Sequence, residues 1–255
     1  MKNYLIKGLH RIVSPVWWEG SDRTGEGDLY TSYTQMNELS KSSFFHNLAG
    51  EWSLINIVSD ATDVTNVFRQ QFRAIWDIWS AEPCNILYCG ADTQMIQPTE
   101  IFGKYHHFLM WNYTDPKSLD EFPHFLNADI RYYPAEMNKT MFDQALEEIK
   151  HATVWNQDQK LYNRMVWGQG LTPEQVINPR LAYQGPNLPG NDQLKEETNE
   201  WNGCPIELAH ICHWHGSRNA KAKLALMEDI NLQLKIPKIP IKTFEIRTID
   251  VSHSP

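Results

Sequence analysis

The position of Asp92 is the one that most directly suggests chemistry. It follows the apolar run Ile86–Cys89 (ILYC) after two small residues, Gly90 and Ala91. A carboxylate just beyond a buried strand is unfavourable unless water, a counter-charge or a metal ion surrounds it. A hard oxygen donor at this place suits Mg²⁺ or Mn²⁺ bridging a pyrophosphate. The ordinary alternative is an aspartate that caps a helix or closes a turn.

A second group of candidates is formed by His210, His213 and His215 near the end of the chain. On a strand, His213 and His215 lie on the same face because they are two residues apart. By themselves the three histidines suggest a zinc hydrolase, but zinc requires three or four ligands and no further cluster has suitable spacing. For His215, an imidazole that is simply packed or exposed is the alternative.

Two other stretches combine amide and carboxylate side chains. Asn127 and Asp129 lie in an apolar segment, and Asp158 and Gln159 begin a helical pattern. A carboxylate in the first helical turn is favoured by the helix dipole, so capping alone would explain Asp158. A core strand that buries an asparagine is the competing account of Asn127.

The elements that would position these residues alternate over the first part of the chain. They read strand, helix, strand, helix, strand, over Arg11–Trp18, about Asp28–Leu48, Trp52–Val58, Thr62–Trp79 and Ile86–Cys89. This order predicts a doubly wound, parallel sheet. Ligands bind beyond the carboxyl ends of the strands in such sheets, and Asp92 lies at such an end.

The second half has a less regular pattern. Strands are expected at Tyr105–Trp111, Ala128–Tyr133 and Leu208–Trp214, and helices at Asn138–His151 and Asp158–Trp167. Gly168–Gly203 is rich in Gly, Pro and Asn and is expected to be a long loop region. Ile236–Pro255, with spaced prolines, is expected to be an extended surface segment or an edge strand.

Composition limits the class of protein. The chain has 255 residues, a net charge of −8 and four cysteines without a C-x-x-C pair. The acidic charge argues against a protein that coats nucleic acid. No apolar run is long enough to span a membrane, and residues 1–8 lack a signal-peptide pattern. We expect one domain with reduced thiols in a cytoplasm, the host's if the protein is viral.

Four stretches resemble GT-A glycosyltransferases. Two of them are Phe125–Pro134 (FLNADIRYYP), similar to a Phe-x-Asn-x-Gly strand with Asp129 in place of Gly, and Asn156–Asn163 (NQDQKLYN), similar to an Asp-Gln-x-x-x-Asn element. Asn85–Thr93 (NILYCGADT) is similar to the strand that leads into their Asp-x-Asp motif, with Asp92 as the second Asp and Gly90 in place of the first. Cys212–Ser217 (CHWHGS) resembles the His-aromatic-x-Gly segment of the retaining glycogenin-like and galactosyltransferase-like families. The resemblance implies a single GT-A (Rossmann-like) α/β domain with a mixed, mainly parallel central sheet and flanking helices.

The resemblance also implies an internal division and a set of roles. Residues 1–100 would be the nucleotide-binding half, 101–235 the sugar and acceptor half, and 236–255 an extended tail. Asp92 and His213 would hold Mn²⁺ or Mg²⁺. The implied donor-binding residues are Arg73, Ala91, Asp92, Asn127 and Gly216, and the implied catalytic or sugar-contacting residues are Asp129, Asp158 and Gln159. The families' Lys-Pro-Trp after the histidine segment is absent, and Arg218 or Lys221 is expected to bind the donor there by neutralising the leaving diphosphate.

The activity implied by the resemblance is sugar transfer from a nucleotide-diphosphate sugar of the UDP type to a hydroxyl acceptor, with retention of anomeric configuration. If the reaction inverts, Asp129 or Asp158 is the candidate base. The acceptor is expected to be a saccharide or a hydroxymethylated base of phage DNA, since short aromatic-rich chains of this kind also occur in phages. The alternatives are a nucleotide-sugar-binding module without catalysis and the zinc hydrolase considered above.

Overall fold

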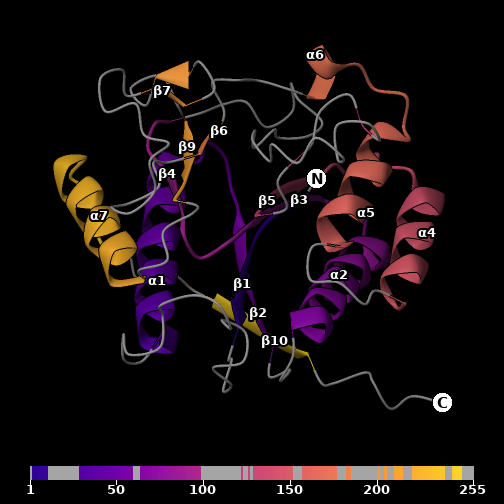
Figure 1. Cartoon of the computed structure of the whole chain (residues 1–255), viewed down its shortest axis with the longest axis horizontal. Coiled ribbons are helices and arrows are strands. Elements are labelled where there is room, and N and C mark those ends of the chain that lie inside the picture. The colour runs from indigo at the N-terminus through magenta and orange to yellow at the C-terminus, as the bar shows by residue number, and fades with distance from the viewer. Residues whose placement is uncertain are drawn as a thin grey trace.

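The computed structural model describes residues 2–10, 29–59, 64–98, 122, 126, 129–151, 157–176, 182–184, 200–201, 204–205, 210–214, 220–238 and 243–248. In this part of the chain a mixed, mostly parallel sheet lies between two layers of helices (Figure 1). The α/β class expected from the sequence is therefore confirmed.

The central sheet has five strands in the order β10-β2-β1-β3-β5. Their bounds are Asn3–His10 (β1), Ser53–Ser59 (β2), Asn85–Cys89 (β3), Ile130–Tyr133 (β5) and Thr243–Thr248 (β10). Strands β10, β2, β1 and β3 are parallel to one another, whereas β5 is antiparallel to β3. Side chains alternate across β1, so that Leu5 and Ile6 enter the hydrophobic clusters on opposite faces.

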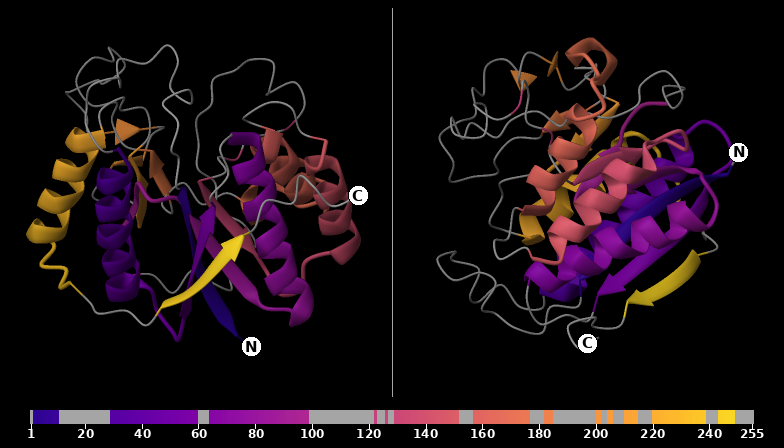
Figure 2. Two further views of the ribbon diagram at one scale, coloured as in Figure 1. Left: turned by 90° about the horizontal axis from the view of Figure 1, so that it is seen from below. Right: turned by 90° about the vertical axis from the view of Figure 1, so that its right-hand side faces the viewer.

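Helices cover both faces of this sheet. Helix α1 (Leu29–Asn47) and helix α7 (Ala220–Gln233) lie together on one side. The other side carries α2 (Val64–Ala81), α4 (Lys139–Ile149) and α5 (Gln157–Trp167), as the two further views in Figure 2 show. The short helix α6 spans Pro173–Val176.

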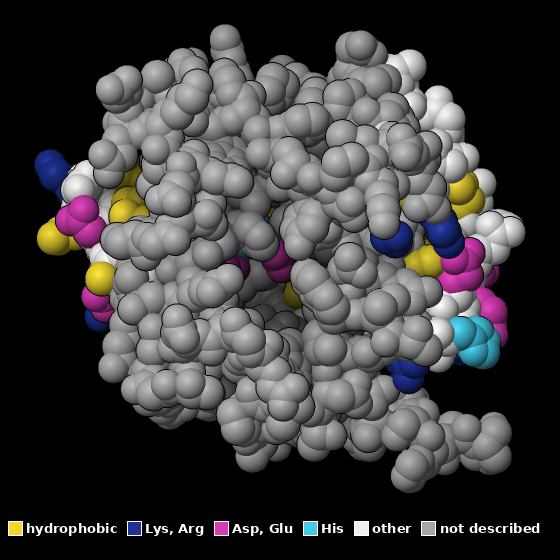
Figure 3. All heavy atoms as spheres, viewed as in Figure 1, with side chains coloured by type: hydrophobic (Ala, Val, Ile, Leu, Met, Phe, Trp, Pro, Cys, Tyr) yellow, Lys and Arg dark blue, Asp and Glu magenta, His cyan; other side chains and the backbone are white. Residues whose placement is uncertain are grey.

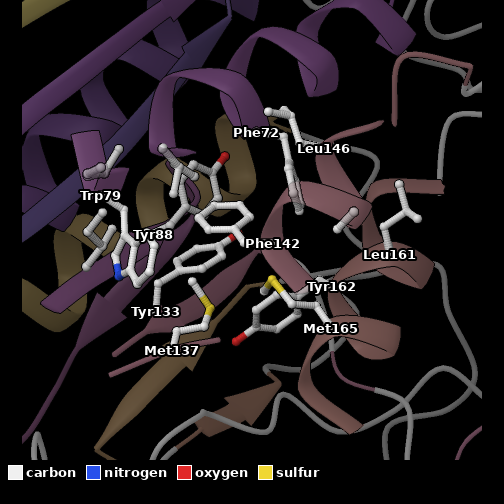
Figure 4. Close-up of a cluster of buried hydrophobic side chains, with 14 of the residues drawn as sticks. Phe72, Trp79, Tyr88, Tyr133, Met137, Phe142, Leu146, Leu161, Tyr162 and Met165 are labelled. Carbon is white, nitrogen blue, oxygen red and sulfur yellow. The ribbon is translucent and has the colours of Figure 1, made fainter. Parts of the chain in front are cut away.

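The larger core cluster fills the space between the sheet and helices α2, α4 and α5 (Figure 4). Phe142 is central to it: its ring stacks on Tyr133 at 5.4 Å and meets Phe72 edge-on at 5.5 Å. Asn138 begins α4 by accepting hydrogen bonds from the backbone amides of Thr140 and Met141. This packing fixes β5, which Asp129 directly precedes, and α5, which carries Asp158 and Gln159.

A small second sheet lies beyond the carboxyl end of β3. Its strands are β4 (Thr93–Met95), β9 (Ile211–His213) and β6 (Ala182–Gln184), in the order β4-β9-β6. Two short strands, β7 (Glu200–Trp201) and β8 (Cys204–Pro205), form an antiparallel pair. Because β4 follows β3 after a turn at residues 90–92, the small sheet brings the histidine segment to the edge of the main sheet.

Most of the expected elements are confirmed, and four expectations need comment. The first strand is Asn3–His10, whereas the strand expected at Arg11–Trp18 and the one at Tyr105–Trp111 lie outside the described residues. The expected loop region contains the short elements α6, β6 and β7. The expected last strand, β9, belongs to the small sheet and not to the central one. Helix α7 was not predicted.

The segment after Ile236 was expected to be an extended surface segment or an edge strand. Strand β10 lies in it and pairs with β2 at the edge of the sheet. Among the described residues, no helix is both long and apolar enough to cross a membrane. The division at residues 100 and 235 stays a prediction.

Candidate functional site

The candidate site lies at the carboxyl end of β3. The chain leaves β1 through α1 to β2 on one side, and β3 lies on the other side of β1, so the strand order reverses between β1 and β3. In open α/β sheets, ligands bind outside the carboxyl ends of the strands at such a reversal. Asp92 follows β3 at this position. Figure 3 shows acidic side chains in a hollow near the middle of one face of the molecule.

Asp92 and His213 meet at this edge. The imidazole Nε2 of His213 is 3.5 Å from Oδ1 of Asp92. The pairing follows from the antiparallel contact of β4 with β9, in which Thr93 lies opposite His213. The backbone amide of Trp214 also donates to the carbonyl of Asp92 at 2.9 Å. The two residues assigned to a metal by the resemblance are thus neighbours.

Asp129 joins them from the adjacent strand. It directly precedes β5, and its carbonyl accepts a hydrogen bond from the amide of Gly90 at 2.7 Å. Its Oδ2 is 3.2 Å from Nε2 of His213. One imidazole therefore faces two carboxylates, because His213 lies within ion-pair distance of both.

Lys223 is the fourth charged member of the cluster. Its Nζ donates to Oδ2 of Asp92 at 2.6 Å, and the lysine side chain is buried. Helix α7, which carries it, is anchored by Gln94. The amide nitrogen of Gln94 donates to the carbonyl of Met227 and to Oδ1 of Asn231, and its oxygen accepts from the indole of Trp214.

The opposite charges in this cluster stabilise one another. Burial alone would raise the pKa of Asp92, but Lys223 and His213 hold it well below its usual range. Burial opposes protonation of His213, yet Asp92 and Asp129 raise the pKa of the imidazole. The cluster therefore favours an ionised Asp92 carboxylate that faces the cationic side chains of Lys223 and His213.

The donor chemistry of the cluster fits a divalent ion, but the described residues do not form a finished metal site. Among them, no three His, Cys, Asp or Glu side chains are grouped so as to hold a metal ion. One oxygen of Asp92 is bound by the ammonium of Lys223. Two carboxylates and an imidazole are nevertheless ligands that Mn²⁺ accepts. A divalent ion would compete with Lys223 for Asp92.

Asp158 lies deeper, at the start of α5. It is buried and accepts a hydrogen bond from Nη2 of Arg131 at 2.9 Å. The guanidinium of Arg131 lies over the ring of Tyr88, 4.6 Å from its centroid. Burial raises the pKa of Asp158 to about 6, although Arg131 opposes the shift. Gln159 is half-buried, and its backbone carbonyl accepts a hydrogen bond from the side-chain Nδ2 of Asn163 at 2.8 Å.

The other residues named from the sequence are dispersed or not described. Arg73 is exposed on α2, where it pairs with Asp77 at 2.9 Å and lies over the ring of Trp76. Ala91 is buried in the turn before Asp92. Lys221 belongs to α7, and the position of its side chain is not described. Outside the described residues lie Asn127, Gly216, Arg218 and His215.

Two buried charged residues, Lys223 and Arg131, were not predicted. Arg131 interrupts an otherwise apolar strand, and a charge in such a run is a signal for a buried partner. Lys223 had a weaker signal, because α7 itself was not predicted and the alternating Ala and Lys at its start are typical of a solvated surface.

The chain matches none of the protein-family models, and no curated protein matches its sequence. The function proposed below therefore rests on the resemblance of short motifs, on residue chemistry and on geometry.

Proposed function

We propose that this protein is a GT-A-type glycosyltransferase that transfers a sugar from a nucleotide-diphosphate sugar, of the UDP type, to a hydroxyl acceptor. The observation that carries the proposal is the meeting of Asp92 and His213 at the carboxyl edge of a mostly parallel sheet. Two motifs of separate origin in the sequence thereby share one site, at the strand reversal where nucleotides bind in open α/β sheets.

Asp92 and His213 are the residues that would hold Mn²⁺ or Mg²⁺. Such an ion, when bound, neutralises negative charge that develops on a departing diphosphate. Lys223 adds a positive charge beside Asp92. Arg218 and Lys221, which follow the histidine motif in the sequence, are proposed to contact the same phosphates. Gly216 would let the phosphates approach the backbone.

The reacting sugar is proposed to lie towards Asp158 and Gln159. Arg131 fixes the carboxylate of Asp158, because both side chains are buried and paired. A carboxylate held in this way would orient sugar hydroxyls without free rotation. Asn127, Ala91 and Arg73 remain donor contacts proposed from the resemblance, and Asp129 a contact to sugar or acceptor. Retention is favoured, with Asp129 or Asp158 as the base if the reaction inverts.

The test of the proposal is donor hydrolysis and transfer by the purified full chain. The protein would be screened against nucleotide-sugars, with Mn²⁺ or with EDTA, and product anomers identified by NMR. Asp92→Asn and His213→Ala should each reduce turnover by at least about a hundredfold. The matched controls Asp143→Asn and His151→Ala change a half-buried residue of α4 and an exposed residue just after it, and should leave turnover unchanged.

Other outcomes would identify the alternatives. Calorimetric donor binding without turnover on any acceptor indicates a binding module, which the absence of a carboxylate at Gly90 favours. One tightly bound zinc ion per chain, together with no hydrolysis of any nucleotide-sugar, indicates a zinc enzyme. Unchanged donor binding and turnover in both Asp92→Asn and His213→Ala would refute the proposed site.

The acceptor is to be decided by direct comparison. Simple saccharides and DNA that contains hydroxymethylcytosine would be offered with the same donor. The net charge of −8 is unfavourable for extended contact with DNA, whereas a flipped base needs only a small basic patch and aromatic stacking. Transfer to one class and not to the other assigns the acceptor.

A further inference from the structure

The end of helix α7 carries two leucines that face water. Leu232 is 76% exposed and Leu234 is 41% exposed, and among the described residues these are the large hydrophobic side chains at the surface. One exposed leucine is ordinary, whereas two in the last turn of one helix form a small apolar patch. Figure 1 shows α7 at the left edge of the molecule, with α1 on its inner side.

Hydrogen bonds fix the direction in which this end of the helix faces. Asn231 is buried; its side chain accepts a hydrogen bond from Gln94 and donates one to the backbone carbonyl of Leu39 on α1. Met227, one turn earlier, is buried in the core cluster between the two helices. Residues four apart share a helix face, so Met227 and Asn231 define the inner face and Leu232 lies outside it. The exposure of Leu232 is therefore a consequence of how α7 packs.

The turn that ends α7 contains a lysine in an uncommon backbone conformation. Lys235 has a φ of 54°, in the left-handed region where glycine is the favoured residue. The amide of Ile236 donates to the carbonyl of Asn231 at 2.8 Å, and that of Lys235 donates to the carbonyl of Leu232 at 3.0 Å. Glycine would satisfy this turn with less strain than lysine does. The turn therefore does not explain why a lysine side chain is present.

Positive charge lies beside the two leucines. Lys235 and Lys238 are exposed, and residues 230–238 include no acidic side chain, in a protein whose net charge is −8. Glu228 and Asp229 are exposed one turn earlier on α7. Basic and acidic charges are thus separated along the helix, and the apolar patch lies at the basic end. Figure 3 shows apolar, basic and acidic side chains together at the left edge, where α7 lies.

An anionic lipid surface fits this arrangement better than a protein partner does. A stable protein interface buries about 800 Å² on each side, whereas the apolar part of this patch consists of two leucine side chains. Apolar side chains that project between lysines can enter the acyl region of a bilayer while the ammonium groups contact lipid phosphates. The same surface would repel Glu228 and Asp229, so α7 would meet it with its last turn and not along its length.

We propose that the end of helix α7, residues 232–238, is a docking site for an anionic membrane surface, with the two leucines inserted among the lipids and the two lysines on their phosphates. This inference goes beyond the proposed function and does not depend on it. Leu232 follows Lys223 by nine residues on the same helix, which corresponds to about 14 Å along its axis. Docking at this end would therefore hold the candidate site at a fixed distance from the membrane.

Binding of the full chain to lipid vesicles, measured by co-sedimentation, tests the proposal. Vesicles of equal parts phosphatidylcholine and phosphatidylglycerol should bind the protein, and vesicles of phosphatidylcholine alone should bind it at least about tenfold more weakly. Leu232→Ser combined with Leu234→Ser should lower affinity for the mixed vesicles by at least about tenfold, since the inserted apolar area is lost. The control Ala225→Ser changes an exposed residue nearer the start of α7 and should bind as the unaltered chain does.

A second pair of variants tests the role of charge. Lys235→Gly suits the left-handed backbone, and together with Lys238→Gln it removes two positive charges from the patch. Each lysine near an anionic surface contributes about fivefold to affinity, so this double variant should bind about 25-fold more weakly and depend less on salt. The control Lys2→Gln with Lys150→Gln removes two exposed lysines elsewhere and should bind within about twofold of the unaltered chain.

The remaining outcomes count against the inference. No binding of the unaltered chain to the mixed vesicles overturns it, and so does full binding by the leucine variant, which would make the attraction purely electrostatic. A dimer that dissociates in the leucine variant, seen by sedimentation velocity without vesicle binding, would assign the patch to a second copy of the chain. Circular dichroism and melting curves verify that each variant is folded. Donor turnover without vesicles should be the same in the leucine variant as in the unaltered chain, and its absence from both bears on the proposed function alone.

Discussion

Lys223 donates from its ammonium to Oδ2 of Asp92 at 2.6 Å, across 131 residues of sequence. Both side chains are largely buried, so each depends on the other for a counter-charge. The contact makes Lys223 part of the candidate site and not merely a neighbour of it. It also places a permanent cation where the proposed divalent ion would bind.

Replacing Lys223 by methionine should separate its role as the counter-charge of Asp92 from its competition with a divalent ion. Without metal, Lys223→Met should lower the free energy of unfolding by about 3–5 kcal/mol, because a buried carboxylate loses its partner. Its Mn²⁺ affinity should rise by at least about tenfold, since no ammonium competes for Asp92. Urea unfolding and Mn²⁺ titration would measure the two changes.

The matched control is Lys139→Met. Lys139 pairs with Asp143 at the surface, and both side chains are substantially exposed. Surface pairs contribute about 1 kcal/mol or less, so this variant should differ little in stability and not at all in Mn²⁺ affinity. Equal or weaker Mn²⁺ binding by Lys223→Met would show that the lysine does not compete with the ion.

Gln94 is expected to set the position of α7. Its side chain makes three buried hydrogen bonds, two to α7 and one to Trp214. Gln94→Met keeps the volume but removes these bonds, and should destabilise the protein by about 2–4 kcal/mol. Hydrogen exchange in α7 should accelerate, as followed by mass spectrometry.

A comparison with Gln169→Met tests whether this effect is specific. Gln169 donates one side-chain hydrogen bond to the carbonyl of Met165, beyond the end of α5. Its loss should lower stability by about 1 kcal/mol or less and leave exchange in α7 unchanged. Similar α7 exchange in both variants would count against an anchoring role for Gln94.

Phe142 offers a test of the core beneath the site. Phe142→Ala should lower the free energy of unfolding by about 3–5 kcal/mol, since the ring contacts both Phe72 and Tyr133. Leu232→Ala, at a residue that is 76% exposed, should change it by less than about 0.5 kcal/mol. Chemical denaturation measures the free energy of unfolding of the two variants. Equal losses of stability would argue against a central role for Phe142 in this core.

The layered fold could be predicted because its signals are local. The apolar run before Asp92 and the amphipathic pattern of residues 64–81 identify a buried strand and a helix on one face of a sheet. The first strand, Asn3–His10, was missed because Lys7 and Gly8 interrupt its apolar residues. Helix α7 was missed because its polar and apolar residues are not separated into clear faces.

The site could be predicted only where a motif carried it. Asp92 and His213 were paired through resemblance, and the register of β4 with β9 brings them together. Lys223 and Arg131 belong to no motif, and the carboxylates that they pair with lie far from them in the sequence. A contact of that kind depends on the packing of helices and strands, which periodicity does not encode. The proximity of Asp129 to Gly90 depends in the same way on the pairing of β5 with β3.

The buried pair of Asp158 and Arg131 predicts a dependence of stability on pH. Burial raises the pKa of Asp158 from 3.8 to about 6, so between these values the folded state binds more protons than the unfolded one. The free energy of unfolding should therefore fall as pH rises from about 4 to about 6, by at most about 3 kcal/mol from this group. Asp158→Asn removes the titration and should flatten that decline, as measured by urea unfolding at several pH values. Asp143→Asn, which changes a carboxylate at the surface, should keep the slope of the unaltered protein, and parallel curves for all three proteins would exclude Asp158 as the source.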